Sequence, residues 1–125
     1  MKLLMAFLLA AAILAGCTGN AAQTDKGNLT NGKTVQINVT AKQWEFVPNT
    51  ITVDQGDTVK LTVSSADVAH GFALPEYGIN ERIEPGKPVV ITFVADKSGE
   101  FGFRCSVMCG EGHRGQTGKL VVRPA

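Results

Sequence analysis

Two cysteines and a histidine stand at intervals of four residues near the C-terminus: Cys105, Cys109 and His113. They belong to the segment 105–116, which reads CSVMCGEGHRGQ and contains three glycines. Thiolate and imidazole groups suit copper, zinc or iron as metal ligands. The segment therefore indicates a metal site close to the last strands of the chain.

The second histidine, His70, lies at the expected start of a strand and could complete the set. Together with Cys105, Cys109 and His113 it gives four ligands, the number found in closed structural zinc sites. The all-β context described below favours copper instead. A disulfide between the two cysteines is the remaining alternative, and it would leave His113 without an evident role.

The composition limits the function classes. The 125 residues are enough for one domain, and 12 Lys and Arg against 11 Asp and Glu give no bulk charge that would favour nucleic acid or an anionic membrane surface. The sequence contains no nucleophile paired with a general base and no phosphate-binding loop. We therefore expect a protein that is not itself an enzyme.

The N-terminal segment predicts export. Residues 1–17 combine a positive start, an apolar run and the sequence LAGC, which resembles the bacterial lipobox. We expect Cys17 to be lipidated and to tether the protein to a membrane; the alternative is an ordinary signal peptide cut near Ala15. Residues 18–32 are small and polar and predict a flexible linker, and residues 33–125 form the domain.

The domain is predicted to be all-β. Apolar and polar residues alternate with the period of two that is typical of half-buried strands, and Pro and Gly separate the segments. The turn at residues 54–57 contains Gly56, which can adopt a positive φ. We expect a Greek-key sandwich or barrel whose strands lie near 35–40, 51–53, 59–63, 70–74, 89–94, 100–104 and 118–122.

Several segments together resemble one known family. The pattern CSxxCGxxH at residues 105–113 is similar to the copper loop of CuA domains, found in cytochrome c oxidase subunit II and nitrous oxide reductase. Further similar segments follow the family order at residues 67–72, 77–79, 83–86 and 118–122. The resemblance implies a cupredoxin fold and a copper site for electron transfer.

The resemblance also implies a ligand set. His70 and His113 would each bind one of two copper ions, and the sulfur atoms of Cys105 and Cys109 would bridge both ions in a mixed-valence CuA-type centre. The backbone carbonyl of Val107 stands where the family has a weak axial ligand.

One position departs from the family pattern. Gln116 occupies the place of an axial methionine, and a harder amide oxygen would favour the oxidised state and lower the reduction potential. Met108, between the cysteines, is expected to pack in the core. Trp44 faintly resembles the aromatic stretch near the electron-entry face of oxidase subunit II; a core or edge aromatic is the alternative. Asp67 and Glu111 are expected in solvated turns, and the alternative is that they support the ligands or dock a partner.

The leading functional hypothesis is an electron carrier of the bacterial periplasm or cell envelope, anchored by lipid. Its partners would be a cytochrome c-like donor and a terminal oxidase or reductase, and it is either free-standing or a subunit of such a complex. A periplasmic copper-binding or delivery protein is one alternative. A mononuclear blue-copper-like carrier is another; it would use His70, Cys109, His113 and Gln116 and leave Cys105 idle.

Overall fold

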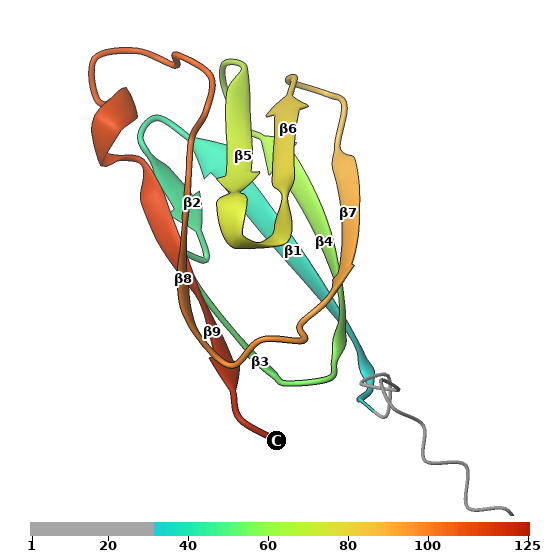
Figure 1. The fold of residues 1–125 in the computed structure, drawn as a ribbon. Coiled ribbons are helices and arrows are strands. Elements are labelled where there is room, and N and C mark those ends of the chain that lie inside the picture. The colour runs from blue at the N-terminus through green and yellow to red at the C-terminus, as the bar shows by residue number, and fades with distance from the viewer. Residues whose placement is uncertain (1–31) are drawn as a thin grey trace, which may run out of the picture.

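A computed structural model describes residues 32–125 (Figure 1). The predicted signal peptide, residues 1–17, and its Cys17 lie outside the described residues, as does nearly all of the predicted linker, residues 18–32. Within the described part, no helix has both the length and the apolar character needed to cross a membrane.

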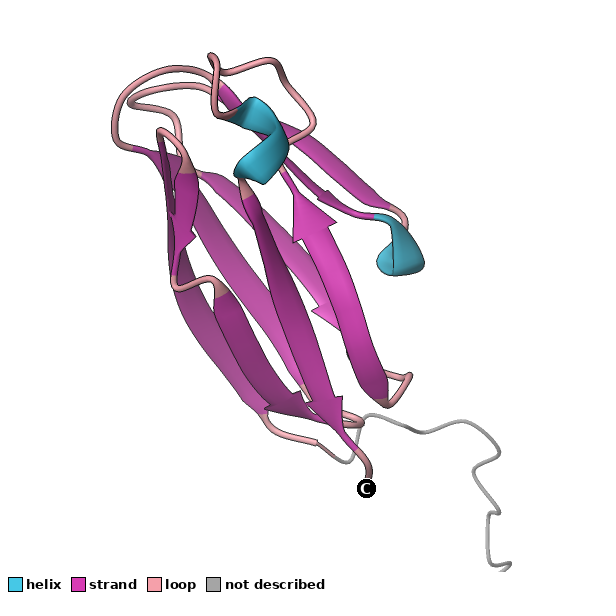
Figure 2. Ribbon diagram, turned by 90° about the vertical axis from the view of Figure 1, so that its left-hand side faces the viewer, coloured by secondary structure: helices cyan, strands magenta, loops and turns pink. Residues whose placement is uncertain are grey.

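The domain is a sandwich of two β-sheets, which Figure 2 shows from the side. One sheet has the strand order β2-β1-β4-β7, with the bounds β1 Thr34–Lys42, β2 Glu45–Val47, β4 Thr58–Ser65 and β7 Val89–Val94. The other has the order β3-β9-β8-β5-β6, with the bounds β3 Thr50–Asp54, β5 His70–Leu74, β6 Ile79–Ile83, β8 Gly99–Arg104 and β9 Thr117–Arg123. Two short 3-10 turns, η2 Pro75–Tyr77 and η3 His113–Gly115, complete the fold.

The predicted all-β, cupredoxin-like Greek-key architecture is confirmed. All of the expected strands are present, and the turn between β3 and β4 contains Gly56 at φ 95° as expected. The sequence prediction missed β2 and β6, which have little alternation: β2 is three residues long, and β6 lies at a sheet edge with its middle three residues exposed.

The inward faces of both sheets build one apolar core. Phe46 from β2 packs edge-on against Phe72 from β5 and Phe103 from β8, with ring centroids 5.7 and 5.3 Å away. The Phe72 and Phe103 rings are 4.9 Å apart, and all three side chains are buried. Aromatic pairs at these distances add directional attraction to the burial of apolar area. The cluster joins the two sheets directly beneath the loops that carry the predicted ligands.

Three connections meet at one end of the sandwich, at the top in Figure 1. They are the β1–β2 turn, the β4–β5 connection that ends at His70, and the long loop from β8 to β9 that contains the two cysteines. Backbone bonds close this long loop: the Cys105 N–H donates to the Gln116 carbonyl at 3.0 Å. The fold thus brings residues distant in sequence to one place.

Candidate metal centre

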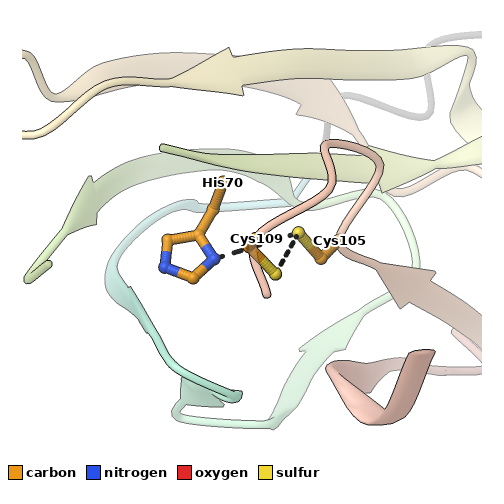
Figure 3. A group of neighbouring side chains, drawn as sticks. All are labelled: His70, Cys105 and Cys109. Carbon is orange, nitrogen blue, oxygen red and sulfur yellow. Dashed lines mark hydrogen bonds between the residues drawn. The ribbon is translucent and has the colours of Figure 1, made fainter. Parts of the chain in front are cut away.

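Three of the predicted ligands meet in the interior at this end. The ligand atoms of His70, Cys105 and Cys109 all lie within 4.8 Å of one another, and all three residues are buried (Figure 3). The two sulfur atoms are 3.4 Å apart, and His70 Nδ1 is 3.9 Å from Cys105 Sγ. A disulfide would need a sulfur separation of about 2.05 Å. Both thiols are therefore free.

His113 approaches the same pair of sulfurs from η3. Its Nδ1 atom is 3.4 Å from Cys109 Sγ, so the two imidazoles lie beside different sulfurs. Ligand atoms that share a tetrahedral metal at bonds of about 2.0–2.3 Å are roughly 3.5 Å apart. The observed sulfur–sulfur and sulfur–nitrogen separations of 3.4 to 3.9 Å therefore fit metal coordination by these four residues.

Asp67 holds the His70 ring in a defined orientation. Its Oδ1 atom lies 2.7 Å from His70 Nε2, and the N–H groups of Gln43 and Val68 donate to the same carboxylate. Burial works against ionisation, but these hydrogen bonds hold the pKa of Asp67 below its ordinary value. An ionised carboxylate favours the proton on Nε2, so Nδ1 presents its lone pair to the sulfurs. Asp67 lies in an exposed bend, as expected, and its carboxylate also orients a candidate ligand.

Gln116 is fully buried, and its amide has a determined orientation. The Nε2 group donates to the Glu45 carbonyl at 3.1 Å, which turns Oε1 towards the site. Oε1 lies 3.0 Å from His70 Nδ1 and 3.2 Å from Cys109 Sγ. An oxygen, a nitrogen and two sulfurs thus converge, and their lone pairs face one another. Thiol protons or a bound cation can satisfy the lone pairs of these four atoms.

The Cys109 thiol is protonated in the metal-free protein. Burial, together with the neighbouring Cys105, raises the pKa of the Cys109 thiol to about 12. In this state Cys109 Sγ–H donates to Gln116, while Cys105 Sγ–H donates to the Val107 carbonyl at 3.0 Å. If a metal were bound, both thiols would lose these protons, and the Gln116 and Val107 oxygen atoms would be free to bind it.

Close backbone packing shapes the pocket around Cys105. The Gly71 N–H donates to Cys105 Sγ at 3.4 Å. A Cβ atom at Gly71 would overlap the Ser106 side chain and approach the Ser106 and Val107 nitrogens to 2.8 Å, so only glycine allows the two segments this near to each other. The residue after His70 thus has a packing reason to be glycine.

The position of Met108 contradicts the prediction that it packs in the core. Its side chain is 75% exposed, whereas Cys105 and Cys109 on either side of it in the loop are buried. It lines a shallow depression of about 530 Å³ together with Val68, Ala69 and Arg82. Met108 thus exposes a thioether at a depression that Cys109 also lines.

Trp44 is half-exposed and contacts the ligand loop. Its neighbour Gln43 contacts the same loop, which the sequence did not predict. Trp44 Nε1–H and Gln43 Nε2–H both donate to the Cys109 carbonyl, at 3.3 and 2.8 Å. Gln43 lies 66 residues from Cys109 in an exposed turn, and only the partial similarity around Trp44 pointed to this segment.

A family model described as cupredoxin-like domain matches residues 4–122. The chain belongs to this family. The curated relatives of this cupredoxin include a nitrous-oxide reductase of Stutzerimonas stutzeri, 35% identical over 106 residues, and a cytochrome c oxidase subunit 2 of Thermus thermophilus, 32% identical over 87 residues. These matches cover 82% and 70% of the cupredoxin.

Among solved structures, the cupredoxin is similar to the periplasmic domain of cytochrome oxidase subunit II of Bradyrhizobium japonicum. The TM-score is 0.67 at 27% identity, over 72% of this chain and 84% of that one. The cupredoxin spans 17% of the Stutzerimonas reductase and 64% of the Thermus subunit. The similarity therefore concerns their copper-domain portion, and the predicted relationship to CuA domains is confirmed.

Proposed function

We propose that this cupredoxin is an electron carrier with a binuclear CuA-type copper centre. The residues that would hold the copper are His70, Cys105, Cys109 and His113, and the Val107 carbonyl and the Gln116 amide oxygen would be weaker ligands. The relationship to CuA domains supports the copper chemistry.

One observation carries the proposal: two free, buried sulfur atoms lie 3.4 Å apart, each beside a different imidazole nitrogen. A mononuclear site built from His70, Cys109, His113 and Gln116 would leave the sulfur of Cys105 idle at this distance. Because each sulfur has an imidazole of its own beside it, we favour a centre that uses both sulfurs.

The protein's own groups would keep the site rigid during electron transfer. Asp67 fixes the tautomer of His70, the Gly71 N–H stabilises negative charge on Cys105, and burial excludes water from both sulfurs. Copper bound there would supply a one-electron couple spread over two metals and two sulfurs. With ligands already in position, little nuclear rearrangement would accompany the change of charge.

The cellular setting belongs to the same proposal. The lipobox-like sequence at Cys17 supports an exported protein of the periplasm or cell envelope, tethered by lipid. Its partners would be a cytochrome c-like donor and a terminal oxidase or reductase. Globomycin, which blocks lipoprotein signal processing, should retain the precursor, and a Cys17→Ala variant should lose membrane association.

Copper reconstitution of the reduced protein tests the proposal. Two copper ions per chain, a purple colour and a seven-line mixed-valence EPR signal are expected. A Cys105→Ser variant serves as the control, since it removes one bridging sulfur and should abolish the seven-line signal.

Two other outcomes would contradict a binuclear electron carrier. One copper ion per chain with a four-line EPR signal would indicate the mononuclear form. Tight Cu(I) binding without reversible oxidation would indicate a copper-delivery protein.

A further inference from the structure

The turn between β1 and β2 reaches across the end of the sandwich to the candidate metal centre. It belongs to the four-stranded sheet, whereas His70 and the two strands that flank the cysteine loop belong to the five-stranded sheet. Residues 43–45 of this turn make hydrogen bonds to three separate segments of the site. None of these three residues carries a group in the ligand set proposed above.

The first contact is a double hydrogen bond to a ligand's own backbone. The Cys109 carbonyl accepts Gln43 Nε2–H at 2.8 Å and Trp44 Nε1–H at 3.3 Å. A carbonyl oxygen has two lone pairs, so these two side chains can satisfy it completely. The peptide that follows Cys109 is thereby fixed from outside the loop.

The second contact is between the indole ring and the glycines of the loop. A Cβ atom at Gly112 would overlap the ring atoms Cγ and Cδ2 of Trp44. At Gly110, which has φ 129°, a Cβ atom would lie 3.0 Å from Trp44 Nε1 and 3.1 Å from Gln43 Nε2. The glycines therefore allow the loop to lie directly on the indole, and the segment between Cys109 and His113 is shaped against it.

The same turn also contacts the two other sides of the site. The Gln43 N–H donates to Asp67 Oδ2 at 2.7 Å, and the other oxygen of this carboxylate orients His70. The Glu45 carbonyl accepts the Gln116 amide, which fixes Oε1 towards the sulfurs. Three consecutive residues thus connect the segments that carry His70, Cys109 and Gln116.

We propose that Gln43 and Trp44 are positioning residues that hold the ligand loop in its metal-binding shape before any metal is bound. This inference rests on the proposed copper function for its purpose. The contacts of Gln43 and Trp44 with the ligand loop, here called the clamp, are present in the metal-free protein. Ligands held in place by surrounding hydrogen bonds lose less freedom on binding a metal. Loosening the clamp should expose the buried thiols by local opening of the loop.

The test uses the full chain with Cys17→Ser, so that Cys105 and Cys109 are the only thiols. The reaction of the reduced, metal-free protein with 5,5′-dithiobis(2-nitrobenzoate) is followed for the double variant Gln43→Met/Trp44→Phe. Phe keeps an aromatic ring on the glycines, and neither new side chain donates a hydrogen bond. Losing two net hydrogen bonds should accelerate thiol modification about tenfold or more.

The matched control is Gln55→Met, in the β3–β4 turn at the other end of the sandwich. It also removes two hydrogen bonds: one from Gln55 Nε2 to the Asp96 carbonyl and one from the Ala125 N–H to Gln55 Oε1. Each rate is measured at the same number of degrees below that variant's Tm, so that differences in global stability do not contribute to the difference in thiol reaction rate. The control should react at the parent rate. Equal rates for the double variant and the control would overturn the proposal, and if the double variant fails to fold, Trp44→Phe alone decides in the same way.

Copper loading provides a second readout. EPR hyperfine splitting should change in the double variant and not in Gln55→Met, because only the former alters the environment of a ligand. If the parent protein bound a single copper ion, the binuclear function would fail, whereas the thiol rates would still decide whether the clamp exists.

Discussion

The two ends of the sandwich each gather side chains from separate segments of the chain, but with different groups. At the metal end, thiols, imidazoles and an amide converge in a largely buried space. At the opposite end, Asp54 binds both Lys33 and Arg123, and the buried carboxylate of Asp57 accepts from the Asp54 N–H at 3.0 Å. The charged groups pair with one another, whereas at the metal end only thiol protons stand between converging oxygen, nitrogen and sulfur atoms that could also bind a cation. One end is therefore built for stability and the other for a ligand.

Removing a sulfur should have the largest effect. Cys109→Ser replaces a soft bridging ligand by a hydroxyl, so we expect copper binding to fall from two ions to at most one, with loss of the mixed-valence signal. Copper content per chain and EPR measure this. Met108→Leu, in the same loop but exposed, is the control and should keep both ions; equal copper content in the two variants would contradict the assigned ligands.

At the charged end, Asp57→Ala should reduce stability without affecting copper. The substitution leaves the part-buried Asp54 N–H without its acceptor, which costs about 1–3 kcal/mol of the free energy of unfolding. Urea unfolding gives this value. Asp57→Asn keeps an acceptor oxygen and should lose less. A loss of copper in Asp57→Ala would show that the two ends are not independent.

Gln116→Met tests how the metal end is tuned. Replacing the amide oxygen by a softer thioether should raise the reduction potential by roughly 60 mV, a tenfold change in a one-electron equilibrium, while the binuclear spectrum persists. Potentiometric titration measures it. A potential that stays the same or falls would exclude axial coordination by Gln116.

The smallest expected effect is the pH dependence of the stability that the ion pairs of Asp54 contribute. Hydrogen bonds from Arg123 and Lys33 hold the pKa of Asp54 below its ordinary value of 3.8. As the pH falls, the Asp54 carboxylate is therefore protonated in the unfolded chain before it is protonated in the folded protein. The stabilisation is full above pH 3.8 and is lost as the pH falls through the lower folded-state pKa. The stability difference between wild type and Asp54→Asn, from urea unfolding, should shrink over this range. A difference that does not vary with pH would contradict the ion pairs.

The long strands were predictable because each buries every second residue, as β1 and β4 do. Edge strand β6 exposes its middle residues and gives no such signal. The candidate ligands His70, Cys105, Cys109 and His113 could be selected because few residue types bind soft metals. The contact from Gln43 could not, since an exposed glutamine in a turn has no distinguishing chemistry until the fold brings it to the Cys109 carbonyl.

The direction of β1 has a geometric consequence. The strand begins at Thr34, next to the start of β4 at the charged end, and runs nine residues to Lys42 beside the ligand loop (Figure 1). At about 3.3 Å per residue this is roughly 30 Å, so the chain enters the domain at one pole and the proposed copper ligands lie at the other. For the lipid-tethered form proposed above, attachment and electron exchange would take place on opposite poles. A partner could then approach the exposed Met108 without competing with the anchor for the same surface.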